Sequence, residues 1–235
     1  MTTKTESPVN DRPRMDPLRQ ESTPAMIAGR VREAIATGVI APGAQLGEAN
    51  LAKELGVSRG PLREGLQRLT AEGLLISIRN RGLFVIEMTP ERVSDMYVAR
   101  QAVERAAAEQ IHQADPVGSG EALLKVIDRM ARTRDQRVQS EADVSFHELL
   151  VARAASPRLS RMHEILITET RMCITALTPL YTPGDQVRVE EHRAIAQSFV
   201  DGDAALTDRL LVAHMADAVE RLTTAVTAAR PGPTS

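Results

Sequence analysis

The sequence predicts a mainly α-helical protein that consists of a small N-terminal domain and a larger, antiparallel bundle of helices. Three observations support this fold class. Ala, Leu, Val, Ile, Arg and Glu dominate the composition, whereas aromatic residues are rare, and this balance favours helices. Apolar residues recur at helical spacing along most of the chain. Short polar or proline- and glycine-containing breaks separate the helical stretches.

The N-terminal part is expected to hold three helices. Residues 1–23 are polar and carry three prolines, so they are expected to form a disordered arm. The first helix is expected to begin at Pro24 and to end at Gly38. The second helix is expected over residues 48–55. The third is expected over about 59–72, where three leucines share one stripe.

A β-hairpin is expected to follow the third helix. The runs LLISI and LFVIEM flank the turn RNRG, which is the signal of a hairpin. The stretch IAPGAQL, which precedes the second helix, is expected to be a turn. Thr89 and Pro90 then fit the N-cap and the first position of a new helix. The first domain is therefore expected to span residues 24–88.

The second domain, residues 89–229, is expected to be an antiparallel bundle with short connections. Residues 230–235 are expected to form a loose tail. Polar and proline-containing breaks divide the bundle into six expected helices, at residues 90–113, 119–138, 140–155, 157–180, 184–201 and 203–229.

Composition narrows the location and the class of partner. Cys173 is the only cysteine, so an internal disulfide is excluded and a reducing cytoplasm is the expected compartment. No run approaches the roughly 18 apolar residues of a membrane span, and the N-terminus lacks the apolar region of a signal peptide. Residues 58–81 hold five arginines and two glutamates within a chain of net charge −2. A locally basic segment on an acidic chain favours contact with a polyanion.

Three helices followed by a hairpin with a basic tip describe a winged helix-turn-helix, placed here before an all-helical bundle. On the third helix, Gly60, Arg63 and Gln67 lie opposite the leucine stripe. Such a helix enters the major groove by its N-terminal end, where Arg59 and Arg63 could reach phosphates or guanine edges. Gly60 would let the backbone approach DNA closely, and Pro61 costs little in a first helical turn.

Arginines on a helix also have an ordinary explanation, because charged side chains usually cover solvated surfaces. Arg68, for example, is better explained by an ion pair with Glu64, four residues earlier, than by DNA. The helices alone therefore leave both explanations open.

A longer motif favours DNA binding. The stretch ANLAKELGVSRGPLREGLQRLTAEGLL, followed by RNRGLFV, resembles the N-terminal domain of the GntR family of bacterial transcription regulators over residues 46–86. Two positions depart from the family pattern: Gly60 stands where Thr is frequent, and Ala49 where some members have Arg. The resemblance implies DNA contacts from the recognition helix and from the tip of the wing in the minor groove, made by Ser58, Arg59, Gly60, Pro61, Arg63, Arg81 and Gly82.

Histidines form a second constellation in the C-terminal part. Asp143 and His147 are four residues apart and share one helix face. His192 and His214 each lie inside a further expected helix. Taken singly, such histidines are more often structural or surface residues than ligands, so spacing alone does not establish a metal site.

The order of these residues resembles the C-terminal ligand-binding domain of the FadR subfamily, called FCD. The resemblance implies that Asp143, His147, His192 and His214 hold one divalent ion per subunit inside the bundle. Three imidazoles and a carboxylate suit Zn²⁺ best, with Ni²⁺ or another first-row ion as alternatives. His112 and His163 fall outside the pattern. Six helices rather than seven indicate the shorter, VanR-like variant.

Arg100 is the expected effector-binding residue. Its surroundings, ARQAVE, resemble the LR-x-x-LE stretch of the FCD domain, which implies a guanidinium fork for an effector's carboxylate, with Glu104 as its structural partner. The alternative is a plain salt bridge within one helix. Ser156 stands where the family usually has Asn, so one pocket contact departs from the pattern.

These features predict a homodimeric transcription regulator, typically a repressor, and not an enzyme. It would bind double-stranded operator DNA and respond to a small organic acid at the metal site. One alternative is a metal-dependent hydrolase with a DNA-binding appendage, since a zinc site with an open position can activate water. Another is that the metal itself is the signal, or that it is purely structural.

Overall fold

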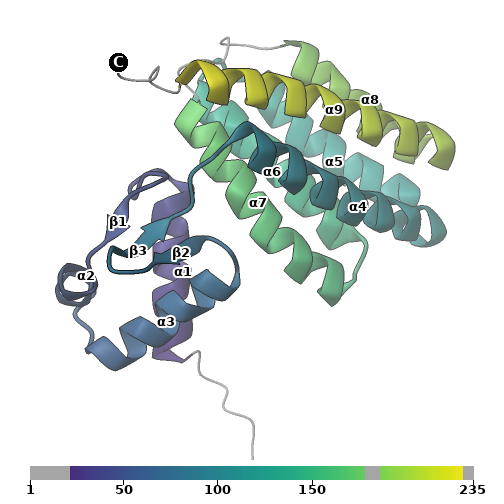
Figure 1. The fold of residues 1–235 in the computed structure, drawn as a ribbon. Coiled ribbons are helices and arrows are strands. Elements are labelled where there is room, and N and C mark those ends of the chain that lie inside the picture. The colour runs from purple at the N-terminus through teal and green to yellow at the C-terminus, as the bar shows by residue number, and fades with distance from the viewer. Residues whose placement is uncertain (1–21, 178–185, 230–235) are drawn as a thin grey trace, which may run out of the picture.

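The computed structural model describes residues 22–177 and 186–229. Within these residues the chain forms a small winged helix-turn-helix followed by a bundle of six helices, which confirms the predicted fold class (Figure 1). Most of the expected N-terminal arm, and the expected tail, lie outside the described residues.

The N-terminal winged domain consists of three helices and a three-stranded antiparallel sheet in the order β1-β3-β2. The leucine stripe of the third helix is buried against the first helix, so its spacing sets the core of this domain. The elements are α1 (Thr23–Ala36), β1 (Gln45–Leu46), α2 (Glu48–Leu55), α3 (Arg59–Ala71), β2 (Leu75–Ile78) and β3 (Gly82–Val85).

One strand was not expected from the sequence. Gln45 and Leu46, at the end of the stretch predicted to be a turn, pair with Phe84 and Leu83 of β3. A two-residue strand is too short to show the alternating pattern of a strand. Its formation depends on the hairpin that it joins, so no local signal announces it.

Gly65 is required where α1 and α3 cross. A Cβ atom at this position would lie 2.9 Å from the backbone oxygen of Pro24 and 2.9 Å from a methyl carbon of Ile27. Gly60, near the start of the same helix, is different. Apart from its own helix backbone and chain neighbours, no heavy atom of the described residues lies within 4 Å of a Cβ atom added there. Gly65 therefore serves the packing of two helices, whereas Gly60 leaves an open surface.

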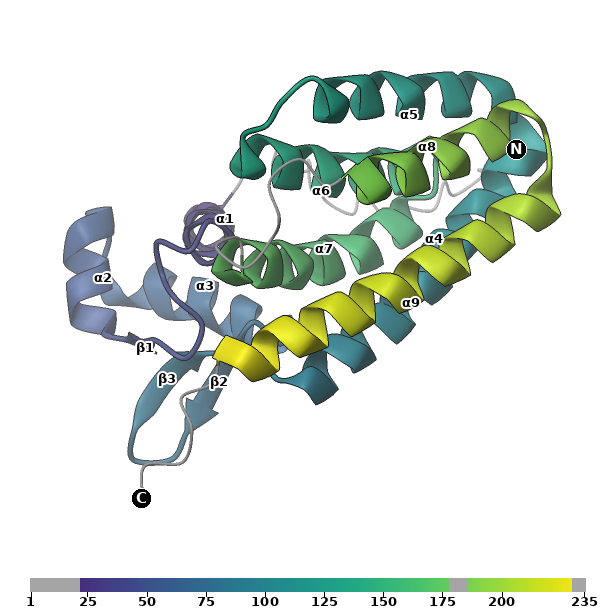
Figure 2. The same cartoon turned by 90° about the horizontal axis from the view of Figure 1, so that it is seen from above.

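The bundle helices run antiparallel and lie side by side in both views (Figures 1 and 2). Thr89 caps the first of them, because its hydroxyl accepts a hydrogen bond from the N–H of Arg92 at 3.2 Å. The helices are α4 (Pro90–Ala114), α5 (Pro116–Ala131), α6 (Gln136–Arg153), α7 (Pro157–Leu177), α8 (Gln186–Val200) and α9 (Ala204–Ala229).

The expected helix at 119–138 is shifted in the structure. Asp115 accepts a hydrogen bond from the N–H of Gly118 and starts α5 three residues early, so DPVGSG is a capped first turn rather than a break. Gly120 belongs to this helix because α8 packs close: an added Cβ would lie 2.7 Å from the backbone oxygen of Ala196. Helix α5 ends at Ala131, earlier than expected, and α6, which Asp135 caps, begins at Gln136 rather than at residue 140.

Helix α7 joins the two parts of the molecule, and Figure 2 shows it beside α1. The Met172 side chain is buried in the core of the winged domain, although α7 belongs to the bundle. The Thr175 hydroxyl donates a hydrogen bond of 3.1 Å to the backbone oxygen of Ala36 at the end of α1. Arg32 on α1 also reaches Glu164 on α7 at 3.7 Å.

The two glycines of α3 generate a paired prediction. Gly65→Ala should lower the free energy of unfolding by about 1–3 kcal/mol, because its Cβ meets backbone that cannot move aside. Gly60→Ala should leave stability unchanged or raise it by up to about 1 kcal/mol, because its Cβ enters open space. Urea unfolding of both variants tests this. Equal effects of the two substitutions would contradict the packing described for α1 and α3.

Candidate metal centre and nucleic-acid interface

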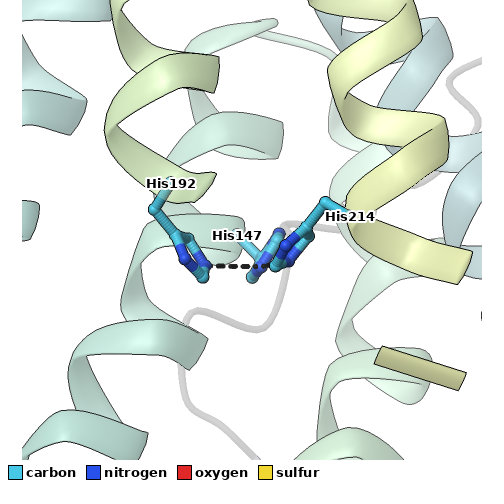
Figure 3. A group of neighbouring side chains, drawn as sticks. All are labelled: His147, His192 and His214. Atoms are coloured by element: carbon cyan, nitrogen blue, oxygen red, sulfur yellow. Dashed lines mark hydrogen bonds between the residues drawn. The ribbon is translucent and has the colours of Figure 1, made fainter. Parts of the chain in front are cut away.

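Three buried histidines from three different helices point at one another inside the bundle (Figure 3). His147 lies on α6, His192 on α8 and His214 on α9. The Nε2 atom of His147 is 3.3 Å from the Nε2 atoms of both His192 and His214. The potential ligand atoms of the three side chains all lie within 4.8 Å of one another. The structure therefore brings together the three histidines that the sequence singled out.

Each of these histidines has an acceptor at its other ring nitrogen. Nδ1 of His147 is 2.7 Å from Oε2 of Glu104, and Nδ1 of His214 is 2.9 Å from Oε2 of Glu191. Nδ1 of His192 is 2.7 Å from the backbone oxygen of Arg188. Carboxylate and carbonyl oxygens only accept hydrogen bonds, so each Nδ1 carries a proton, and in the neutral ring each Nε2 then presents a lone pair. Three lone pairs converge on one point.

Burial keeps the imidazoles of His147 and His192 in the neutral form, which binds metals. It lowers the pKa of His147 to about 4 and the pKa of His192 to about 3, so both are neutral at neutral pH. The positive charge of Arg100 also opposes protonation of His147. Metal binding requires neutral imidazole, so the protein does not have to remove a proton from these rings before an ion binds.

Asp143 lies beside the three histidines rather than among them. Its Oδ1 atom is 3.3 Å from Nε2 of His192, but it does not belong to the group whose atoms lie within 4.8 Å of one another. Burial would raise the pKa of this carboxyl, but His192 and Arg188 outweigh it and hold the pKa well below its usual range. Asp143 is therefore an ionised carboxylate at the edge of the cluster.

The donor set fits a divalent cation. An ion held tetrahedrally by nitrogen at about 2.0–2.1 Å keeps its ligand atoms about 3.3–3.4 Å apart. The two Nε2–Nε2 distances of 3.3 Å agree with that spacing. A cavity of about 20 Å³, lined in part by Asp143, Arg188 and His214, adjoins the cluster. It has room for roughly one water molecule.

Arg100, the expected effector residue, is 1% exposed and lies in the same polar network. Its Nε atom donates to Oε1 of Glu104 at 2.7 Å, and Nη1 donates to the hydroxyl of Thr170 at 3.4 Å. The salt bridge within α4 is thus present. It does not use the whole guanidinium, because Nη2 is buried without a hydrogen-bond partner among the described residues.

The other two histidines have separate positions. His112 stacks on Phe199 and is hydrogen-bonded to Thr207, away from the cluster. His163, on α7, is buried, and its Nε2 atom is 3.2 Å from Oε1 of Glu104. Sequence spacing missed this link, because nothing in the pattern relates a histidine on α7 to a glutamate on α4. Ser156 lies at the start of α7, where its hydroxyl accepts a bond from the N–H of Leu159.

The expected DNA-binding residues lie on the surface of the winged domain. Ser58 precedes α3, and its side chain makes no capping hydrogen bond within the described chain. Arg63 is exposed and forms an ion pair with Glu48 of α2, with 2.7 Å between Nε and Oε2. Pro61 is half-buried, and the other expected contacts on this helix are exposed, namely Ser58, Arg59, Gly60 and Gln67.

The tip of the wing is basic and exposed. Asn80 and Gly82 take positive φ values of 62° and 102°, which fold the chain back between β2 and β3. Arg81 stands between them, with its guanidinium carbon 5.3 Å from the centre of the Phe84 ring. Arg68 and Glu64 form no ion pair in the described part of the chain, so the explanation offered for Arg68 is wrong.

Comparison with known families decides the class of protein. Residues 23–85 match the family described as bacterial regulatory proteins, gntR family. Residues 95–217 match the FCD domain. The chain belongs to the GntR family. It is a DNA-binding transcriptional regulator with a C-terminal FCD domain, as the motif and the histidine spacing indicated.

This GntR regulator is similar to two curated repressors and to a protein of known structure. It is 32% identical to the "Probable D-xylose utilization operon transcriptional repressor" of Paenarthrobacter nicotinovorans, over 86% of this chain and 91% of that protein. It is 31% identical to the gluconate operon transcriptional repressor of Bacillus subtilis (strain 168), over 57% of this chain and 56% of that protein. A GntR protein of known structure from Rhodococcus sp. RHA1 is similar, with a TM-score of 0.71 and 25% identity, over 88% of this chain and 99% of that one. All three relatives are named as regulators of transcription. In the described residues, no helix is long and apolar enough to cross a membrane.

The exposed position of Arg63, which is paired only with Glu48 in the described residues, leads to a prediction about operator affinity. Arg63→Ala should weaken binding to an operator selected from random duplexes about ten- to hundredfold, as expected for an arginine that reads a base. Arg68→Ala, on the same helix but outside the proposed contacts, is the matched control and should change binding little. Fluorescence anisotropy at fixed salt measures both. Wild-type affinity for Arg63→Ala would remove this residue from the interface.

Proposed function

We propose that this regulator is a repressor, as its relatives are named, that it binds operator DNA as a homodimer, and that a small carboxylate bound at a metal site in the bundle controls its affinity. The observation that carries this proposal is a buried cluster with unused binding capacity. Three imidazole lone pairs converge on one point, and a buried guanidinium nitrogen in the same network lacks a partner among the described residues. Buried polar atoms normally have partners, so a ligand is expected here.

His147, His192 and His214 would hold the ion, with Asp143 completing the set. Zn²⁺ is the preferred ion for three imidazoles and a carboxylate, with Ni²⁺ or another first-row ion as alternatives. When bound, the ion supplies a positive charge and coordination positions that a carboxylate oxygen can occupy. Glu104 and Glu191 orient two of the rings through their Nδ1 atoms.

Arg100 would provide the second contact to the acid. Its Nη2 atom is a charged donor that is already desolvated, and such donors bind carboxylates strongly. The adjoining cavity of about 20 Å³ is too small for an organic acid. Binding would therefore require side chains or helices around the cluster to move. A ligand that binds only a rearranged bundle shifts the equilibrium towards that state.

Helix α7 would carry this movement to the DNA-binding part. Thr170 of α7 contacts Arg100, and His163 of α7 contacts Glu104. Two residues further along from Thr170, Met172 packs into the winged domain, and Thr175 bonds to the end of α1. Movement of α7 would shift α1, against which the recognition helix α3 is packed. In a dimer the spacing of the two recognition helices must match the operator half-sites.

Thermal-shift measurements test the proposal. Protein stripped of metal and protein loaded with Zn²⁺ are each screened against a library of small organic acids. We expect Zn²⁺ to raise the melting temperature at one ion per subunit, and a subset of acids to raise it further only in the loaded protein. His192→Asn should abolish both effects, whereas His112→Asn, outside the cluster, should retain them.

Operator binding completes this test. An acid found in the screen should change the operator affinity of the loaded protein. If graded Zn²⁺ alone changes operator affinity and no acid does, the protein senses the metal and the proposed effector is wrong. If wild-type protein binds no divalent ion, the metal-dependent part of the proposal fails.

The α7 contacts generate a separate prediction. Thr175→Val keeps the shape of the side chain but removes the hydrogen bond to Ala36. The change in operator affinity caused by an active acid should shrink, while Zn²⁺ affinity stays at the wild-type value. Thr227→Val is the control, since the Thr227 hydroxyl bonds only within α9. An undiminished response in Thr175→Val would show that this contact does not carry the signal.

A further inference from the structure

Glu104 is the most completely buried carboxylate of the polar network. Its exposed fraction is 0%, and both of its oxygens have partners. Oε2 accepts from Nδ1 of His147 at 2.7 Å. Oε1 accepts from Nε of Arg100 at 2.7 Å and lies 3.2 Å from Nε2 of His163. Burying a carboxylate is costly unless it is paired in this way, so its position needs a reason.

A salt bridge with Arg100 is not a sufficient reason. Pairs four residues apart on a helix form readily on the surface, where no burial is needed. Such a pair would also leave the second oxygen free to face solvent. Here that oxygen is directed at His147, which is the histidine whose Nε2 atom contacts both of the others.

We propose that Glu104 is a positioning residue for the metal centre: it fixes the proton of His147 on Nδ1, so that the Nε2 lone pair faces His192 and His214. This inference rests on the proposed metal site. Glu191 and the backbone oxygen of Arg188 do the same for the other two rings. Glu104 differs from them because it also holds Arg100, so one carboxylate sets the orientation of both a metal ligand and the expected effector contact.

The variant Glu104→Gln separates this role from simple space filling. Glutamine has nearly the same shape, but one of its two terminal atoms is a donor. Arg100 is always charged and can only donate, so the amide oxygen is expected to face Arg100. The amide nitrogen then faces His147, whose Nδ1 must accept, and the ring proton moves to Nε2. A protonated Nε2 cannot bind a cation.

The experiment uses full-length, metal-stripped protein and Zn²⁺ alone as the probe. Zn²⁺ affinity is measured by competition with a chromophoric chelator. The proton position on His147 is read in the metal-free protein from long-range ¹H–¹⁵N spectra of the imidazole, with its signals assigned by their loss in His147→Gln. Glu104→Gln should show the proton on Nε2 and bind Zn²⁺ about 10–100-fold more weakly than the wild type. Glu109→Gln, an exposed glutamate on the same helix, is the control and should match the wild type in both measurements.

A double variant keeps the proposal testable if Glu104→Gln folds poorly. In Arg100→Met/Glu104→Gln the competing donor is gone, so the amide oxygen is free to accept from His147. In this protein the proton should return to Nδ1, and the Zn²⁺ affinity should be higher than that of Glu104→Gln. Where the single variant cannot be purified, the Zn²⁺ affinity of the double variant should lie within about tenfold of the wild-type value. Loss of Zn²⁺ binding in the double variant, with the proton on Nδ1, would overturn the proposal.

The remaining outcomes are also decisive. If the wild type binds Zn²⁺ and Glu104→Gln binds it equally well, Glu104 does not position the ligand, although the metal centre stands. If affinity falls while the proton stays on Nδ1, the effect is one of charge and the proposed mechanism is wrong. If the wild type binds no Zn²⁺, the proposed function fails first, and the two failures are therefore distinguishable.

Discussion

The hydrogen bond between Glu104 and His147 is the contact on which the interior of the bundle depends. It joins α4 to α6, and the other oxygen of the same carboxylate joins α4 to α7 through His163. His147 in turn meets His192 and His214, from α8 and α9. A buried charge without partners would cost several kcal/mol, so these five helices must adopt positions that satisfy one another's polar atoms. Apolar side chains surround this cluster, but they accept many arrangements, whereas the hydrogen bonds accept few.

Periodicity and capping residues predicted most of the fold because they are local properties. The leucine stripe of α3, the cap at Thr89 and the shared face of Asp143 and His147 all follow from spacing within one helix. Contacts between helices could not be predicted in the same way. Spacing shows which residues face inward, but not which inward residues of different helices meet. The role of Glu104 towards His147, the position of His163 and the pairing of β1 belong to this second class.

Composition misled where a residue type has two uses. Glycine and proline in DPVGSG indicated a break, yet Asp115 caps a helix there and Gly120 lets α8 approach. The same ambiguity applies to the glycines of α3, one of which is needed for packing while the other has no neighbour. A glycine in a helix therefore marks either a close approach in the core or an open surface. Only the neighbouring helices distinguish the two cases.

The two ends of the molecule differ in how easily their polar contacts can change. Arg63 and Glu48 are exposed, and exposed pairs are weak and screened by salt, so Arg63 would exchange its partner for DNA at little cost if it makes the proposed contact. The cluster around His147 is buried, and its side chains cannot exchange partners without leaving a buried charge unpaired. A ligand that did rearrange it would move whole helices. On α7 the distance from Thr170 to Thr175 is five residues, or about 7.5 Å along the axis. Over so short a length a helix behaves as a rigid rod, so under the proposed mechanism a displacement at the buried network would reach α1 almost undiminished.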